Sequence, residues 1–238
     1  MTIRPEEGAP PTAMGPYSVP EAVGRRALHM RGRSVSLEHI DAARTALVVV
    51  DMQNHFVAAG FPMEVPAARA IVPTVNRIAR ALRAAGGTVV WIQTTAAGAL
   101  QSWRNHPRHI LAPERARQRL ASLDESATGY ALFAAIEAMP GHMYAKKTKY
   151  SAFIAGSSTL DQELRAKGID TLLICGTATN VCCESTARDA TMLDYRVAML
   201  SDATATWTDE EHRAALTSFV LFFGDVLTTE EALTRLVS

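Results

Sequence analysis

The sequence predicts an α/β fold, a three-layer α/β/α sandwich with a mainly parallel, Rossmann-like sheet. Short apolar runs rich in β-branched residues alternate with segments of helical periodicity, which is typical of parallel βαβ units. The chain has 238 residues, of which 48% are hydrophobic, and its formal net charge is +0. A chain of this length and composition is able to build one full core. Polar, chemically reactive residues directly follow several of the apolar runs, at the edge where open parallel sheets carry their sites.

The rhythm of strands and helices begins at Arg44. The run A-L-V-V-V over 46–50 is the first expected strand, and T-V-V-W-I-Q over 88–93 is the second. Between them a helix follows Pro66 and ends at a Gly-Gly pair. Its apolar positions recur every three or four residues, at Ile71, Val75, Ile78 and Leu82. The polar and basic stretch 98–126 has no such period, and we interpret it as an excursion over the site.

The second half of the chain repeats the alternation. A short strand is expected over 142–145, a strand over 171–175 and a strand over 196–200, because each is apolar and bounded by polar or turn residues. Helical patterns cover 158–167, which ends at a glycine, and 180–193. Two closing helices are expected to start near Asp209 and Thr229.

Composition excludes several classes of function. The 24 basic and 24 acidic residues leave no excess charge for nucleic acid, and no apolar run is long enough for a membrane span. The N-terminus lacks the apolar region of a signal peptide, and three cysteines do not make a disulfide framework, so we expect a cytoplasmic protein. No Cys/His spacing is typical of a metal site, and we expect neither a metal nor another cofactor.

The segment C-G-T-A-T-N-V-C-C-E-S-T-A-R-D over 175–189 is the most informative part of the chain. It places Cys182 in the first turn of a helix that follows a buried strand. A thiol at a helix N-terminus ionises more easily than a free cysteine, and the unpaired N–H groups of that turn are able to hold an oxyanion. The segment by itself is equally consistent with Cys182 being a small buried hydrophobic residue, which is the commonest state of a free cysteine.

Two further residues are expected at the same edge of the sheet. Asp51 follows the first strand, and Lys147 follows the third. Each has a plain interpretation, since an aspartate often caps a turn and Lys147 lies in the charged run K-K-T-K. The convergence of an acid, an ammonium and a thiol favours an enzyme.

The motifs resemble those of the isochorismatase-like cysteine hydrolases, and their wording is most similar to the ureidoacrylate and N-carbamoylsarcosine amidohydrolase branches. The matches follow the order of that family: A-L-V-V-V-D-M-Q-N (46–54), K-T-K-Y-S-A-F (147–153), G-T-A-T-N-V-C (176–182), T-A-R-D-A (186–190) and S-D-A (201–203). We therefore expect an isochorismatase-like hydrolase domain over 44–238, preceded by an N-terminal arm over 1–43.

The resemblance implies a catalytic triad of Asp51, Lys147 and Cys182. It also implies a cis peptide between Ala178 and Thr179, with the backbone N–H groups of Ala178 and Cys182 forming an oxyanion hole. Gln53, Phe153 and Asn180 are candidates for the substrate pocket. We expect a small amide or ureide as the partner, and a homo-oligomer, either a dimer or a tetramer.

The chain departs from the family pattern in two places. The metal-binding members carry an Asp-x-His pair after the second strand, where this chain reads Q-T-T-A-A-G, which argues against a metal and against nicotinamide as substrate. Cys183 stands where the family commonly has valine. One residue further along a helix it points about 100° away from Cys182 and is expected to pack in the core.

The expected function is hydrolysis of a C–N bond in a small carboxamide or ureido compound through a thioester-type intermediate. Three alternatives remain: vinyl-ether hydrolysis of the isochorismate type, which does not need the thiol, a cysteine phosphatase, and a non-catalytic binding protein. The spacing from Cys182 to Arg188 is C-x5-R, as in phosphatases, but the intervening residues C-E-S-T-A include an acid and no glycine. We expect Arg188 to form an ion pair away from the thiol.

Overall fold

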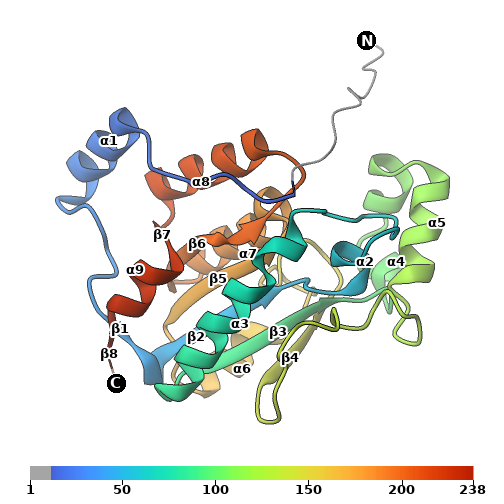
Figure 1. Ribbon diagram of the computed structural model, residues 1–238. Helices are drawn as coiled ribbons and strands as arrows, with labels where there is room; N and C mark the ends of the chain where they lie inside the picture. The colour runs from blue at the N-terminus through green and yellow to red at the C-terminus, as the bar shows by residue number, and fades with distance from the viewer. Residues whose placement is uncertain (1–11, 238) are drawn as a thin grey trace.

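The computed structural model describes residues 12–237, and its centre is a six-stranded, wholly parallel sheet (Figure 1). The strand order is β4-β3-β2-β5-β6-β7. The strands are β2 (Thr45–Val50), β3 (Thr88–Thr94), β4 (Met143–Lys147), β5 (Thr171–Thr177), β6 (Arg196–Ala205) and β7 (Asp225–Leu227). The chain runs outward through β3 and β4 from β2 and then returns to the other side through β5, so β2 and β5 are central neighbours with a crossover between them. The predicted three-layer α/β fold is confirmed.

Helices cover both faces of the sheet. Helices α3 (Ala68–Ala84) and α9 (Thr229–Thr234) pack on one face, and α6 (Leu160–Ala166), α7 (Glu184–Met192) and α8 (Asp209–Phe222) on the other. The remaining helices are α1 (Glu21–Arg31), α2 (Asn54–Val57), α4 (Ala99–Ser102) and α5 (Pro113–Ser122). Helices α8 and α9 each begin with a capping box, in which a threonine and a glutamate satisfy the free N–H groups of the first turn.

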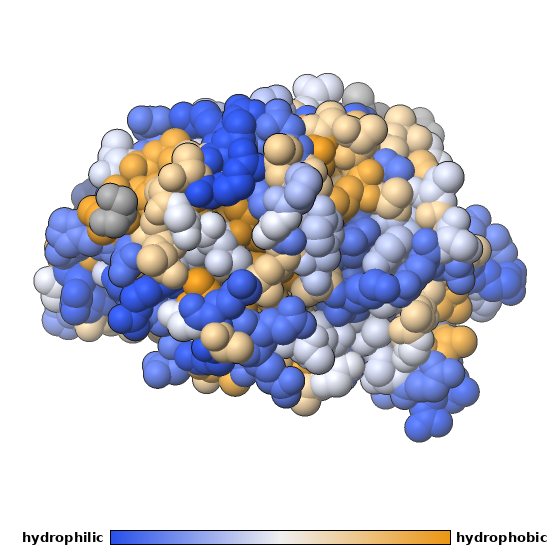
Figure 2. All heavy atoms as spheres, turned by 90° about the horizontal axis from the view of Figure 1, so that it is seen from below, coloured by the Kyte–Doolittle hydropathy of each residue, from blue (hydrophilic) through white to orange (hydrophobic). Residues whose placement is uncertain are grey.

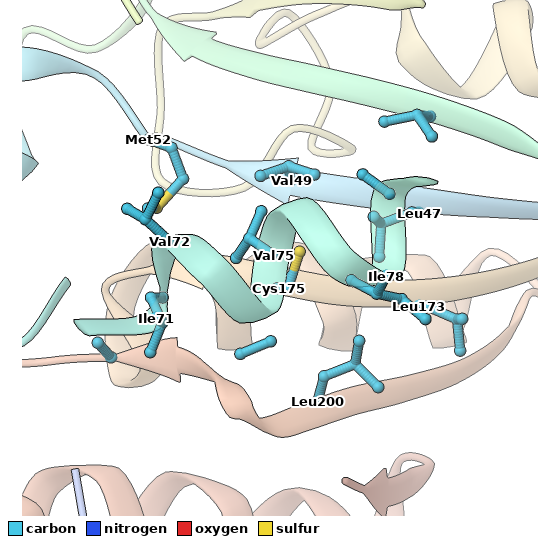
Figure 3. Close-up of a cluster of buried hydrophobic side chains, with 14 of the residues drawn as sticks. Leu47, Val49, Met52, Ile71, Val72, Val75, Ile78, Leu173, Cys175 and Leu200 are labelled. Atoms are coloured by element: carbon cyan, nitrogen blue, oxygen red, sulfur yellow. The ribbon is translucent and has the colours of Figure 1, made fainter. Parts of the chain in front are cut away.

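The apolar face of α3 shows how the sequence period builds the core. Val72, Val75 and Ile78 lie on one side of this helix and point toward the sheet (Figure 3). They meet Leu47 and Val49 of β2, together with buried residues of β5 and β6. The helix thus buries one stripe on the central strands, which holds their carboxyl ends in place.

The segment before the sheet is packed on the domain within the described residues. Ile40 and Leu37 are buried in the same core as α3, and a two-residue strand β1 (Ile40–Asp41) pairs in parallel with β8 (Leu236–Val237) near the C-terminus. Arg31 at the end of α1 binds Asp225, which also accepts hydrogen bonds from two backbone N–H groups. The part of the expected arm over 12–43 therefore covers the domain, whereas the proline-rich start over 1–11 lies outside the described residues.

The predicted strands and helices are found, and the structure contains further elements that the sequence analysis did not predict, among them α1, α2, β1 and β8. The polar excursion is not a plain loop, because it contains α4, a π-helical turn η2 (His106–Ile110) and α5. The short edge strand β7 was not predicted, since its three residues give no alternating or apolar pattern. Figure 2 shows hydrophilic residues over much of one face of the molecule, with hydrophobic ones scattered among them. Within residues 12–237, no helix is both long and apolar enough to cross a membrane.

Candidate active site

The carboxyl ends of β2, β4 and β5 bring Asp51, Lys147 and Cys182 together. Asp51 follows β2 directly, Lys147 is the last residue of β4, and Cys182 lies in the π-helical turn η3 (Thr179–Cys183) after β5. The Lys147 Nζ lies 2.8 Å from the Asp51 Oδ2 and 3.5 Å from the Cys182 Sγ. The three residues are 0%, 1% and 6% exposed, respectively, so the group is almost fully enclosed by protein. The residues that the sequence motifs selected therefore form one contact cluster, with the ammonium between acid and thiol.

A fourth residue, Thr94, joins this cluster. Its hydroxyl accepts a hydrogen bond from the Lys147 Nζ at 2.7 Å and donates one to the Asp51 Oδ1 at 2.9 Å. The Lys147 ammonium also donates to the carbonyl of Lys149 at 3.1 Å. Buried charges are stable when they are paired and hydrogen-bonded, and this ammonium meets that condition. Sequence reasoning missed Thr94, although it ends β3, the strand between those of Asp51 and Lys147.

The backbone at the sheet edge is shaped for close approach. Asp51 has a φ of 52°, a left-handed conformation that few residues other than glycine adopt. Across from it, Gly176 has a φ of 108°, and a Cβ there would lie 2.1 Å from the Val50 carbonyl oxygen. Only glycine fits, because β5 passes directly against the end of β2 at this point. This contact sets the separation between Asp51 and the turn that carries Cys182.

The turn before Cys182 contains a non-proline cis peptide, but the sequence-based placement was wrong by one bond. It joins Thr177 to Ala178, whereas we expected it between Ala178 and Thr179. The strand β5 continues to Thr177, so the chain reverses at the first bond after the strand. The Ala178 carbonyl then accepts hydrogen bonds from the N–H groups of Val181 and Cys183, each at 3.1 Å, and not from the Cys182 N–H between them.

Side chains hold this turn from three directions. The Thr177 hydroxyl donates to the Ala205 carbonyl at 3.1 Å, and the Thr179 hydroxyl lies 2.9 Å from the Nδ1 of the buried His212. The Asn180 Oδ1 accepts from the Thr206 hydroxyl at 2.7 Å. The turn is therefore fixed against β6 and α8, which is the condition for a preorganised set of N–H donors.

The electrostatics of the resting site differ from the expectation for a helix N-terminus. Burial raises the pKa of the Cys182 thiol to about 12, and the nearby Asp51 carboxylate adds to the rise, while the Lys147 ammonium opposes it. Burial alone would lower the pKa of Lys147, but Asp51 and Cys182 outweigh it and hold that pKa above its ordinary value. The expected ease of ionisation is thus not found, because burial keeps Cys182 a neutral thiol beside an ion pair.

A cavity of about 190 Å³ opens onto the thiol. Aromatic and aliphatic side chains form most of its wall, with one cation among them. The lining residues are Phe56, Met63, His106, Leu111, Arg119, Tyr150, Ala178, Val181, Cys182 and Trp207. They come from α2 and the loop after it, from the excursion, from the loop after β4, from the turn after β5 and from the loop after β6.

None of the three expected pocket residues lines this cavity. Gln53 is buried and donates to the carbonyls of Thr94 and Tyr130, so its amide ties the segment after the excursion to the sheet. The Phe153 ring packs against that of Tyr195, with ring centroids 5.5 Å apart. Asn180 is held by Thr206 as described above. All three serve the framework of the site, because their polar atoms or rings already have protein partners.

The excursion supplies part of the cavity wall. The Nε2 of His106 lies 2.8 Å from the Tyr150 hydroxyl. The Trp103 ring stacks on the His106 ring, with ring centroids 4.1 Å apart. Burial and then the charge of Arg119 lower the pKa of His106 to about 4, so this ring is neutral near pH 7. Sequence reasoning did not single out Arg119, because one arginine among five in the excursion carries no distinguishing pattern.

The other residues named from the motifs have structural partners. Cys183 is fully buried, with its Sγ 3.8 Å from the Cys175 carbonyl, as expected for a packing residue. Arg188 binds Glu184 one turn earlier and stacks over Phe223, away from the thiol. Within residues 12–237, no cluster of three His, Cys, Asp or Glu side chains is arranged to hold a metal ion. That the reaction needs no metal stays a prediction.

Comparison with known proteins identifies the family. The family model described as the isochorismatase domain matches residues 45–231. The chain is 36% identical over 236 residues to the ureidoacrylate amidohydrolase RutB of Variovorax paradoxus, covering 92% of this chain and 91% of that protein. A crystal structure of a cysteine hydrolase from Pseudomonas syringae superposes with a TM-score of 0.73 at 30% identity, covering 82% of this chain and 93% of that one.

A second solved structure, N-carbamoylsarcosine amidase from Thermoplasma acidophilum, superposes with a TM-score of 0.61 at 26% identity. It covers 79% of this chain and 97% of that chain. The resemblance to cysteine hydrolases that the sequence motifs indicated is thereby confirmed, and so is the expectation of a hydrolase. The chain belongs to the isochorismatase family.

Proposed function

We propose that the protein is a cysteine amidohydrolase that cleaves a C–N bond of a small ureido, N-carbamoyl, compound. The observation that carries this proposal is the contact of the Cys182 thiol with the Lys147 ammonium at 3.5 Å, with Asp51 behind it and a small cavity in front. The names of the relatives support it: one is a ureidoacrylate amidohydrolase and another an N-carbamoylsarcosine amidase. At about 190 Å³ the cavity is smaller than the roughly 300–1,000 Å³ of drug-sized ligand sites, so the substrate is small.

The proposed reaction is acyl transfer in two stages. The Asp51 carboxylate accepts the thiol proton as the sulfur attacks the carbonyl carbon, and the Lys147 ammonium stabilises the charge on sulfur. The carbonyl oxygen becomes an oxyanion held by N–H groups of the turn over 178–182. The C–N bond then breaks, and Asp51 returns its proton to the leaving nitrogen. Water hydrolyses the acyl-sulfur bond with Asp51 as base, which restores the thiol.

The raised pKa of Cys182 fits this order of events. A thiol whose pKa is raised by burial is largely neutral at neutral pH, which favours loss of its proton to Asp51 as the sulfur attacks. Asp51 is an acceptor next to the thiol that needs no external base. The site therefore favours deprotonation that is coupled to bond formation.

The alternatives fit the site less well. Phosphoryl transfer requires donors around three equatorial oxygens, whereas the cavity wall is mostly apolar. Vinyl-ether hydrolysis does not need a thiol in contact with an acid and an ammonium. A non-catalytic binding protein gives no reason to bury a complete triad, because two buried charges are costly to desolvate.

The test is to trap the covalent intermediate. Incubation with a slow amide or ureide, acid quench and mass spectrometry should show an acyl or carbamoyl adduct on the peptide that contains Cys182. Ammonia release should be lost in Cys182→Ala and retained in Cys183→Ala, which is the matched control one residue away. Asp51→Asn should lower kcat by a factor on the order of 10² or more, the scale of a lost general base. Aryl phosphatase activity that disappears in Cys182→Ser, with no adduct from any amide, would overturn the proposal.

A further inference from the structure

The cavity wall contains one charged side chain outside the triad, that of Arg119 on α5. The remaining lining side chains are aromatic, aliphatic or the thiol itself, apart from the His106 ring and the Tyr150 hydroxyl, which bind each other. Arg119 is half-buried, and its guanidinium makes no hydrogen bond or salt bridge to any of the residues 12–237. Leaving such a group without a partner beside an apolar surface is unfavourable. A half-buried guanidinium without a protein partner at the cavity wall is therefore available to bind an anion from outside the protein.

The neighbouring arginines show that this situation is specific to Arg119. On the same helix, Arg117 is exposed and binds Glu114, while Arg115 donates to the Pro62 carbonyl. Two arginines of α5 thus find protein partners, and the one that faces the cavity does not. Ala116, one turn earlier, is buried, so this side of α5 packs inward over the site. In Figure 1, α5 lies at the end of the molecule beside α2, which supplies Phe56 to the same cavity.

The charge of Arg119 reaches both ends of the cavity. After burial, it is the next cause that lowers the pKa of His106, and it also lowers the pKa of the Cys182 thiol, although less than Lys147 does. His106 is neutral near pH 7, so no second cation shares the anion with Arg119. A single guanidinium with apolar surroundings matches a monoanion of planar shape, because its fork of N–H donors fits a carboxylate in bidentate geometry.

We propose that Arg119 binds the carboxylate of the substrate, so that the natural substrates are small ureido or amido acids whose acid group and reacting carbonyl are separated by a short apolar stretch. The apolar wall of Phe56, Met63 and Leu111 would then contact the middle of the molecule. This inference rests on the proposed function. In that function the reacting carbonyl of the substrate meets Cys182, and the inference assigns the partner of the carboxylate at the other end. Arg119 acts as a specificity-determining residue and takes no part in proton transfer.

The experiment compares two ureides of similar shape, 3-ureidopropanoate and the uncharged 3-methylbutylurea, in four proteins. These are the wild type, Arg119→Gln, Arg119→Lys and the control Arg117→Gln. The wild type should prefer the acid. Arg119→Gln should lose about 10- to 100-fold in kcat/KM for the acid, mainly through KM, and much less for the neutral ureide. Arg119→Lys should recover part of the loss, because it keeps the charge without the fork. Arg117→Gln should behave as the wild type.

Equal losses on both ureides would overturn the inference, since Arg119 would then act on the thiol and not on the substrate. A wild type without preference for the acid would overturn it too. A binding experiment separates this failure from that of the proposed function. Calorimetry on Cys182→Ala, alone and combined with Arg119→Gln, should show Arg119-dependent binding of 3-ureidopropanoate. If neither ureide is hydrolysed but this binding is found, the proposed chemistry is wrong and the carboxylate site stands. If the acid binds no better than the neutral ureide, the carboxylate site is wrong.

Discussion

At the scale of single residues, the site depends on the buried ammonium of Lys147, which has several hydrogen-bond partners. Lys147 contacts Asp51, Thr94, the Lys149 carbonyl and Cys182 at once. Because its three N–H bonds are taken by acid, hydroxyl and carbonyl, the ammonium is held in place beside the sulfur, where the proposed reaction would develop charge. Besides the thiol itself, Thr94 has a side chain that hydrogen-bonds both Asp51 and Lys147. It is therefore a positioning residue.

Replacing Thr94 by valine should expose that role. The variant keeps the side-chain volume but removes the hydroxyl bonded to both charges, so kcat should fall by about 10- to 100-fold, as expected for lost hydrogen bonds to charged groups. The pH–rate profile should also shift, which a purely structural role would not cause. Thr95→Val is the control, because the Thr95 hydroxyl binds Glu125 outside the triad. A Thr94→Val enzyme with the kcat and pH profile of the wild type would contradict this assignment.

At the scale of elements, the close approach of β2 and β5 places the acid beside the thiol. The register pairs Val50 with Gly176. Val50 immediately precedes Asp51, and Gly176 immediately precedes Thr177, where β5 ends. The positive φ of Gly176 and the missing Cβ are both needed there. The helix α3, packed over these strands on one face (Figure 3), and the contacts of α8 with the η3 turn on the other make this arrangement rigid.

The change Gly176→Ala should disturb stability and activity together. An alanine at positive φ, with its Cβ against the Val50 backbone, should lower the free energy of unfolding by more than about 1 kcal/mol. It should also move Asp51 relative to Cys182 and lower kcat. The control Gly24→Ala lies on α1, where an added Cβ meets only Val19 at 3.9 Å, and should leave stability unchanged or raise it. Urea midpoints and kcat of both variants decide the matter, and an unchanged urea midpoint in Gly176→Ala would be evidence against this account.

At the scale of the whole molecule, three buried histidines couple stability to pH. Burial is the first cause that lowers the pKa values of His55, His106 and His212 to about 4. In the unfolded chain a histidine titrates near 6.5. Between these two values the unfolded chain binds more protons than the folded one, so the free energy of unfolding falls as the pH is lowered from about 6.5 toward 4.

His212 allows this coupling to be measured at one residue. Its Nδ1 is bonded to Thr179 of the η3 turn, and its Nε2 has no partner among the described residues. In His212→Gln the dependence of stability on pH between 6.5 and 4 should be weaker by up to about 1.4 kcal/mol per pH unit, the limit for one proton. The exposed His109→Gln should keep the wild-type slope. Chemical unfolding at several pH values measures both slopes, and an unchanged slope in His212→Gln would contradict the coupling.

The predicted independence from metal is also a property of the whole molecule. The stretch after β3 holds no Asp-x-His pair, and the ammonium of Lys147 supplies the positive charge next to the thiol. Prolonged incubation with EDTA should therefore leave ammonia release unchanged. Activity that is lost on chelation and restored by zinc or manganese would show that this expectation is wrong.

The sequence by itself determined most strands of the sheet, the helices between them and the convergence of Asp51, Lys147 and Cys182 at one edge. It could do so because β-branched runs and helical periods are local, and because parallel strands bring their carboxyl ends to one edge. Only the tertiary structure decided the parts that depend on distances between remote segments. Thr94 acts through Lys147, which is 53 residues away, and Arg119 matters because α5 turns it toward a cavity built from five parts of the chain. The raised pKa of Cys182 likewise comes from burial, a property of the packed molecule that no motif encodes.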